Sequence, residues 1–108
     1  MSTDFERFSK TEWEVLKDVA RTIRYFVRDR KYGYVDKLAN AFTAQVAEVA
    51  LREAIRDARS AADQGEKVHL PSDNVIKDLI ELLKRDLSAA GVLATLALVY
   101  PSTQEVDE

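Results

Sequence analysis

The segment from Ser9 to Lys31 constrains the fold more than any other part of this sequence, because two residue classes recur in it at helical spacing. The apolar class falls three or four positions apart, at Val15, Leu16, Val19, Ile23, Phe26 and Val27. Ser9 and Glu12 precede it in the capping-box arrangement, Ser followed by Glu three residues later. The pattern predicts an amphipathic helix over residues 11–31, ended by Gly33 in a left-handed cap.

The second class on this helix is basic. Its members, spaced alternately by four and three, are Lys17, Arg21, Arg24, Arg28 and Lys31. At 100° per residue they occupy a wedge of roughly 80°, and we name them the basic strip. One flank of the strip carries Glu14, Asp18, Tyr25 and Asp29. The helix therefore has three sides: an apolar face, an acidic flank and the basic strip.

Apolar spacing predicts further helices. A short second helix contains Val35, Leu38, Ala39 and Phe42. Thr43 is a candidate N-cap for a third helix over residues 44–63 that stops at Gly65, although Phe42 and Thr43 fit an unbroken second helix as well. Such a mixture of aliphatic and charged residues, with only three Gly and two Pro, is typical of a helix-rich globular domain.

The remainder of the chain continues the helical pattern after a polar connector. Residues 66–71 form this connector, and residues 67–70 suit a short extended segment. Ser72 caps a fourth helix, which either runs through Gly91 to Tyr100 or breaks near residues 88–91; Pro101 ends it. We therefore expect a single all-α domain over residues 1–108, a bundle of four to five helices with flexible ends at 1–8 and 102–108.

Composition and motifs argue against several classes of protein. The chain has no cysteine, and the connector over residues 66–71 that carries its one histidine, His69, contains no serine, so we expect no catalytic residues, no metal site and no cofactor. The first twelve residues lack a signal peptide's apolar run, and the apolar part of residues 87–104 is too short for a membrane span. A cytoplasmic protein with no membrane contact and no small-molecule substrate is the expectation.

Metal-dependent all-α nucleotide hydrolases hold their metal ion with paired acids on facing helices. Five acids of this chain could be assigned to such a site, but ion pairing along the helices explains them more simply. They are Glu48, Glu53, Asp57, Glu81 and Asp86. Arg52 lies four positions from Glu48, Arg56 three from Glu53, and Lys77 and Arg85 four from Glu81, as in ordinary helical ion pairs. The basic strip differs, because no acid shares its face. It is about 21 Å long, and Trp13, Tyr32 and Tyr34 lie near its ends, a combination of cations and aromatics that binds single strands. The alternative is a solvated basic face with these aromatics packed in the core.

Four stretches of this sequence carry a resemblance to a known family. They are the run YGYVDKLANA (residues 32–41), the Pro71-Ser72 helix start, Arg85-Asp86-Leu87, and ALVYP (residues 97–101). Together they resemble the small-subunit family of archaeal type I-A CRISPR interference complexes, which are of the Cascade type. The similarity spans residues 12–102.

The resemblance implies a non-catalytic subunit, present in several copies beside the crRNA-bound backbone, that helps to hold the displaced DNA strand of an R-loop. The basic strip would follow phosphates, with Arg30 and Lys37 extending it. Copies would stack head to tail through residues 87–100 or through the acidic surface. The competing hypothesis is a helical protein-interaction module, such as an immunity, anti-defence or adaptor protein, without nucleic-acid contact.

Overall fold

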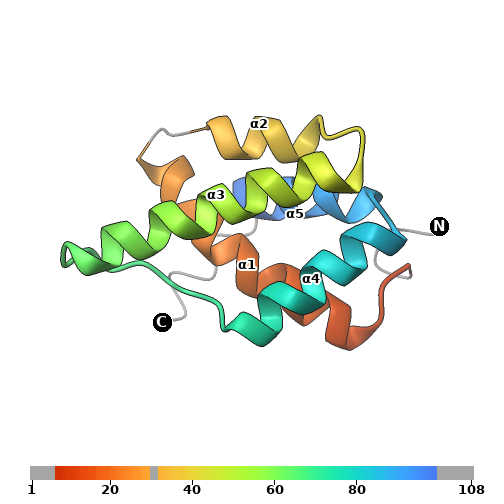
Figure 1. Cartoon of the computed structure of the whole chain (residues 1–108), viewed down its shortest axis with the longest axis horizontal. Coiled ribbons are helices and arrows are strands. Elements are labelled where there is room, and N and C mark those ends of the chain that lie inside the picture. Colours follow the sequence, from red (N-terminus) through yellow and green to blue (C-terminus); the bar gives the residue numbers. More distant parts are fainter. Residues whose placement is uncertain (1–6, 30–31, 100–108) are drawn as a thin grey trace.

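The computed structural model describes residues 7–29 and 32–99 of the chain, and within them it has five α-helices and no strand. These are α1 (Lys10–Arg28), α2 (Gly33–Ala39), α3 (Ala44–Asp63), α4 (Asp73–Arg85) and α5 (Ser88–Val99). Figure 1 shows α3 crossing the near side of the molecule, with α2 and α4 on either side of it. The predicted all-α bundle is confirmed, and residues 67–70 remain irregular instead of forming a strand.

Hydrogen bonds at the helix ends explain where the helices start and stop. Ser9 Oγ accepts from the Glu12 amide at 3.1 Å, and the Glu12 carboxylate accepts from the Ser9 amide at 2.9 Å, which confirms the capping box. Thr43 and Ser72 cap α3 and α4 through their hydroxyls as expected. At the end of α3, Gly65 takes a φ of 93°, and backbone bonds from residues 65 and 66 close a Schellman motif.

The connection between α1 and α2 differs from the prediction in where α1 ends and in the role of Gly33. The helix ends at Arg28, with Asp29 as its C-cap, and Gly33 begins α2 instead of closing α1 in a left-handed conformation. The reason lies in α2, because Val35 and Leu38 are buried and reach the core only if the chain turns back directly after α1. Arg30 and Lys31, the expected end of the first helix, lie outside the described residues.

The predicted position of Phe42 on the apolar face of the second helix is wrong. The chain leaves α2 at Asn40, whose side-chain amide donates to the Asp36 carbonyl at 2.9 Å. Thr43 then opens α3, so that Phe42 lies in the intervening loop and is 79% exposed. The alternative of one unbroken helix through Thr43 is thereby excluded.

A break also separates α4 from α5. It lies at Asp86 and Leu87, slightly before the expected position, and Gly91 is an interior residue of α5. Asp86 Oδ1 accepts from both the amide and the hydroxyl of Ser88, at 3.1 and 2.7 Å. These bonds, with Arg7 close by, hold the pKa of Asp86 below its ordinary value. A charged, hydrogen-bonded Asp86 thus redirects the chain at the start of α5.

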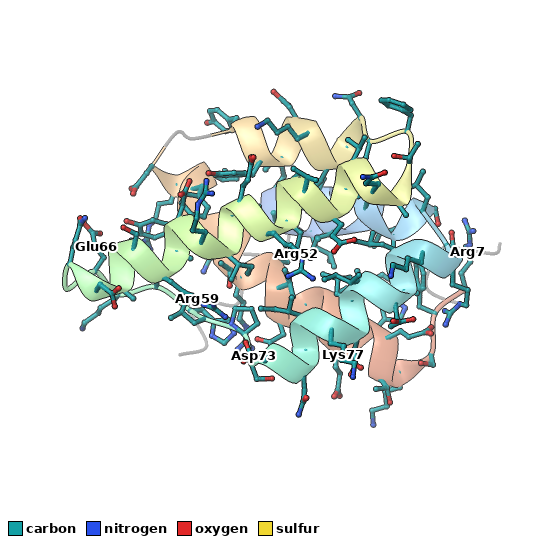
Figure 2. All side chains as sticks on the ribbon, viewed as in Figure 1. Arg7, Arg52, Arg59, Glu66, Asp73 and Lys77 are labelled. Carbon is teal, nitrogen blue, oxygen red and sulfur yellow. The ribbon has the colours of Figure 1, made fainter. Side chains whose placement is uncertain are left out.

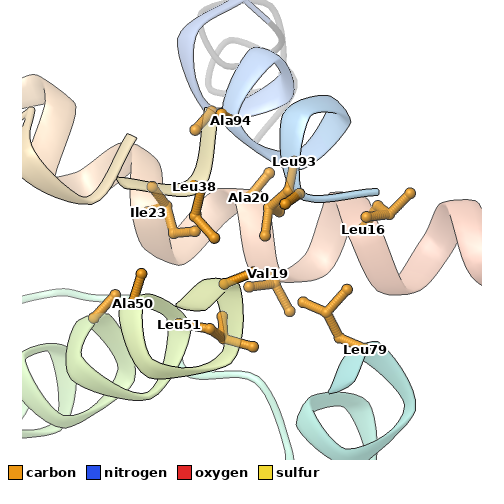
Figure 3. Close-up of a cluster of buried hydrophobic side chains, with 14 of the residues drawn as sticks. Leu16, Val19, Ala20, Ile23, Leu38, Ala50, Leu51, Leu79, Leu93 and Ala94 are labelled. Atoms are coloured by element: carbon orange, nitrogen blue, oxygen red, sulfur yellow. The ribbon is translucent and has the colours of Figure 1, made fainter. Parts of the chain in front are cut away.

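All five helices contribute to one core. Figure 3 shows side chains of α1 at its centre, with Leu38 of α2, Leu51 of α3 and Leu79 of α4 arranged around them. On α5, Leu93 and the small residues Ala90, Ala94 and Ala97 are buried, which lets this helix lie close against its neighbours. Phe8, which we expected in a flexible N-terminal segment, is buried and meets the Trp13 ring edge-on at 5.7 Å between centroids.

We predict that Leu16→Ala destabilises the protein by about 2 to 5 kcal/mol, because Leu16 is fully buried where α1 meets the core and its truncation leaves a cavity. Urea unfolding followed by circular dichroism measures this change. Val99→Ala is the matched control: Val99 is 70% exposed at the end of α5, so its truncation should change stability by less than about 0.5 kcal/mol. Equal effects of the two variants would contradict the central place of α1.

Candidate nucleic-acid interface

The basic strip lies on the side of α1 that the rest of the bundle leaves open. The apolar face of α1 enters the core, and α5 and α4 pack against the helix more extensively than α2 and α3 do. Of the described strip residues, Arg21 and Arg28 are exposed, and Lys17 and Arg24 are half-buried. The strip therefore keeps a solvent-facing position along α1, as far as Arg28.

The connector between α3 and α4 covers the acidic flank of α1. Thr22, which is fully buried, donates its hydroxyl to the His69 carbonyl at 2.6 Å. Tyr25 donates to the Glu66 carboxylate at 2.8 Å. The His69 ring is also hydrogen-bonded to Asp18. His69 is thus a half-buried histidine that attaches the connector to α1.

This connector explains why acids and Tyr25 gather on one side of α1. Asp18 binds His69, and Tyr25 is buried beneath the connector with Glu66 as its partner. The hydrogen bond and the negative charge of Glu66 raise the pKa of Tyr25 to about 12. The acidic flank is therefore a docking surface for residues 66–69, and sequence spacing alone does not reveal what covers it.

Acids border the N-terminal half of the strip more closely than the sequence indicates. Lys17 and Arg21 line a shallow groove between α1 and the start of α4. Glu14 and Asp18 line it from α1, and Asp78 adds a carboxylate from α4. The more purely basic part of the strip accordingly lies toward Arg24 and Arg28, away from Asp78.

Individual strip residues differ in their surroundings. The Arg28 guanidinium lies over the ring of Tyr25, 5.6 Å from its centroid, which orients it along the helix surface. Arg21 makes no ion pair with any residue in the described ranges 7–29 and 32–99. Arg21 is therefore available to an external anion.

The aromatic candidates are arranged in two ways. Tyr32 is 49% exposed at the start of the α1–α2 turn. Tyr34 instead packs on Phe26, with 5.0 Å between ring centroids, and donates its hydroxyl to Asp57. Burial and that carboxylate raise the pKa of Tyr34 to about 12. Trp13 is half-buried against Phe8, so an exposed aromatic platform near the strip is provided by Tyr32.

Lys37 has two partners within the bundle. Its ammonium group lies 3.3 Å from the Glu53 carboxylate and over the ring of Tyr34, 6.0 Å from the centroid. It belongs to α2, so the structure places it apart from the strip residues on α1. A ligand that reaches Lys37 would share its ammonium group with Glu53.

The acids considered for a hydrolase have partners within the protein. Glu48 binds Arg52 at 2.9 Å, Glu53 binds Lys37, and Asp57 accepts from Tyr34. Asp86 binds Arg7 at 2.9 Å as well as Ser88. Across the described ranges, no group of three or more histidine or acidic side chains is placed to hold a metal ion. Arg59 of α3 reaches Asp73 on α4 at 3.0 Å.

A second cationic surface, between α3 and α4, has no counterpart in the sequence analysis. Residues from both helices line a groove there, and the two rows of cations face each other only after folding. Each row taken alone has acids of its own and reads as an ordinary solvated helix surface. The one feature of the sequence that could have indicated this groove is the spacing of Lys77 and Lys84, which are two helical turns apart on α4.

Comparison with protein-family models, with curated proteins and with solved structures finds no match to this chain. None of the helices in residues 7–29 and 32–99 combines the length and apolar character that crossing a membrane requires.

We predict that Thr22→Val weakens the attachment of the connector to α1. The substitution keeps the side-chain shape and removes the donor to the His69 carbonyl, at a cost of about 1 to 2 kcal/mol. Chemical unfolding gives the free energy, and amide hydrogen exchange should increase in residues 66–70. Thr95→Val is the control, since Thr95 also donates to a backbone carbonyl but is exposed on α5. A similar loss of unfolding free energy in both variants would contradict a specific role of Thr22 in attaching the connector.

We also predict that Glu66→Gln lowers the pKa of Tyr25 from about 12 toward its ordinary value of 10.0, because the variant removes the carboxylate charge facing the phenol. A folded-state pKa above the unfolded one stabilises the protein fully below pH 10.0, and this contribution disappears as pH rises toward 12. Tyrosinate absorbance during alkaline titration measures the shift. Tyr34 is the internal reference, and an unchanged Tyr25 transition would contradict the Glu66 contact.

Proposed function

We propose that this chain is a non-catalytic subunit of an RNA-guided DNA-targeting complex similar to type I-A CRISPR interference complexes, and that it contacts the displaced DNA strand. The observation that carries the proposal is the solvent-facing position of the basic strip on α1, while the apolar face of that helix is packed in the core and Asp18 and Tyr25 of its acidic flank are bonded to the connector. In such a complex, guide pairing supplies sequence specificity, so a strip that recognises phosphates without reading bases is sufficient.

The charge distribution supports a role for the strip in a protein that is acidic overall. Residues 17–37 hold seven cations and three acids, in a chain of net charge −3. A local cationic surface attracts phosphates, and the acidic remainder limits indiscriminate adhesion to nucleic acid. Arg21, Arg24 and Arg28 are the principal phosphate contacts in this proposal, with Tyr32 as a stacking platform for a base.

Several copies acting together fit the modest charge of one strip. R-loop formation is close to balanced energetically, so weak contacts repeated along a row of copies can shift it. The apolar segment over residues 87–100 was one of two expected stacking surfaces, beside the acidic surface. In the described part of α5, Leu93 is buried, Val92 and Leu96 are half-buried, and only Leu98 and Val99 among the large apolar side chains are exposed. Any stacking through this segment would use the end of α5.

A protein-interaction module remains the second candidate, because apolar side chains are exposed elsewhere. Phe42 is exposed in the α2–α3 loop. On α3, exposed Val49 and half-buried Val46 line a largely apolar groove. Exposed apolar clusters of this kind mark protein contacts. The same nucleic-acid experiment separates the two candidates.

We expect the protein to bind single-stranded DNA with a steep dependence on salt. Neutralisation of three to five phosphates gives a log–log slope of roughly −2 to −3.5 for a single strand. Arg21→Glu/Arg24→Glu/Arg28→Glu should abolish binding of an oligothymidylate, as measured by fluorescence anisotropy, with helicity retained in circular dichroism.

Two further variants test whether position on the surface matters beyond net charge. Lys67→Glu/Lys77→Glu/Lys84→Glu changes the net charge by the same amount on other surfaces and should retain most of the binding. Asp78→Asn removes an acid that borders the strip and should tighten binding. If the wild-type chain fails to bind at low salt, alone and with the backbone subunits of such a complex, the nucleic-acid role is wrong and the protein-interaction role is favoured.

A further inference from the structure

The groove between α3 and α4 is a second cationic surface, which the proposed contact of the basic strip with a single strand does not use. Its volume is about 480 Å³. Figure 2 shows Arg52 and Arg59 extending from α3 toward α4, where Asp73 and Lys77 lie. The cations that line the groove are Arg52, Arg56 and Arg59 from α3, and Lys77 and Lys84 from α4. Both walls of the groove therefore carry positive charge.

Two of the three acids that line the groove are already compensated by its arginines. Glu48 accepts a hydrogen bond from Arg52 at 2.9 Å, and Asp73 accepts one from Arg59 at 3.0 Å. A guanidinium group has five N–H donors, so each arginine keeps donors beyond the one that its carboxylate uses. The two ion pairs thus hold guanidinium groups at the groove with N–H groups left for a second acceptor.

The remaining charged groups give the groove its positive excess. Lys77 and Lys84 make no ion pair with any residue in the part of the chain that the structure describes. Arg56 has Asp57 as its carboxylate neighbour at 3.8 Å, too long for a normal hydrogen bond. The third acid that lines the groove is Glu81. Five cations against three acids leave two positive charges unbalanced.

The accessible surface of the groove is polar, because its isoleucines belong to the core. Ile55, Ile76 and Ile80 are 5%, 7% and 7% exposed. Within residues 7–29 and 32–99, none of the exposed large apolar side chains lines this groove. The centre of a protein interface buries apolar and aromatic side chains, whereas cations and N–H donors are sufficient to bind phosphates. The groove therefore favours a phosphate-bearing ligand over a protein segment.

The spacing and the lining of the groove indicate a backbone whose bases are paired. Lys77 and Lys84 are seven residues apart, about 10.5 Å along α4, and Arg52 and Arg59 have the same spacing on α3. Rows of this length contact several linked phosphates. None of the described residues that line the groove is aromatic, whereas sites for single strands use aromatic rings to stack bases. A duplex keeps its bases stacked inside and presents phosphates.

We propose that the α3–α4 groove binds the phosphate backbone of a nucleic-acid duplex. Arg56, Lys77 and Lys84 neutralise phosphates, and the remaining N–H donors of Arg52 and Arg59 bind phosphate oxygens. The assignment rests on the proposed function, which supplies the nucleic acid, and it deepens that function: the strip contacts a single strand and the groove contacts a duplex. An R-loop contains both.

Fluorescence anisotropy of the full chain with a labelled DNA duplex tests this assignment. The wild-type chain should bind the duplex at low salt, and Lys77→Glu/Lys84→Glu should weaken binding about tenfold or more. Lys10→Glu/Lys67→Glu carries the same change in net charge on residues that do not line the groove and should retain most of the binding. Glu81→Gln removes the remaining acid and should tighten binding, a gain that loss of folding cannot produce.

The basic strip provides the comparison that separates this site from the proposed single-strand contact. Arg21→Glu/Arg24→Glu/Arg28→Glu should lose an oligothymidylate and keep most of its affinity for the duplex, and Lys77→Glu/Lys84→Glu should do the reverse. The groove assignment is overturned if the wild-type chain does not bind the duplex, if Lys10→Glu/Lys67→Glu loses as much affinity, or if Glu81→Gln binds more weakly. Each of these results is independent of binding to the oligothymidylate.

Competition and amide chemical shifts identify the occupant. An RNA–DNA hybrid of the same sequence is compared with the DNA duplex, and shifts centred on residues 52–59 and 76–84 with either one support the proposal and name the duplex. If the oligothymidylate shifts the same amides, the groove takes single strands. If poly-L-glutamate displaces the labelled duplex as effectively as unlabelled duplex does, an acidic protein is the favoured ligand. Either of these two results overturns the duplex assignment.

Discussion

Burial of the apolar face of α1 is the constraint on which the rest of the structure depends. The helix presents fully buried Leu16, Val19 and Ile23 to the core, and every other helix meets that core. Once this face is fixed, the rotation of α1 about its axis is fixed as well, and the basic strip can only face outward. The exposure of the strip is thus a consequence of packing on the opposite side of the same helix.

Hydrogen bonding by the connector completes the arrangement around α1. The connector lacks regular structure, so its backbone carbonyls need donors from elsewhere, and Thr22 supplies one to His69. Tyr25 and Asp18 anchor the same segment through side chains. The connector leads into α4, whose Asp78 lines a groove together with Lys17 and Arg21.

The two charged surfaces of the protein differ in physical character. The strip belongs to one helix and carries one sign of charge on its face, which suits a flexible polyanion. The α3–α4 groove belongs to two helices and carries both signs of charge above isoleucines that are buried in the core.

Local interactions explain how much of this protein was predictable. Ser9, Thr43, Ser72 and Gly65 specify helix ends through bonds to residues three or four positions away, so the sequence was enough to locate them and to establish the helical class of the fold. The spacing of the strip on α1 follows from the same local geometry. The early end of α1 depended instead on which side chains found room in the shared core. The exposure of Phe42 and the turn at Asp86 accompany local hydrogen bonds of Asn40, Thr43 and Asp86, at places where the residue pattern had left a continuous helix open as an alternative. The bonds of the connector to Asp18, Thr22 and Tyr25, and the groove between α3 and α4, join residues that are far apart in the chain. Only tertiary packing brings such residues together.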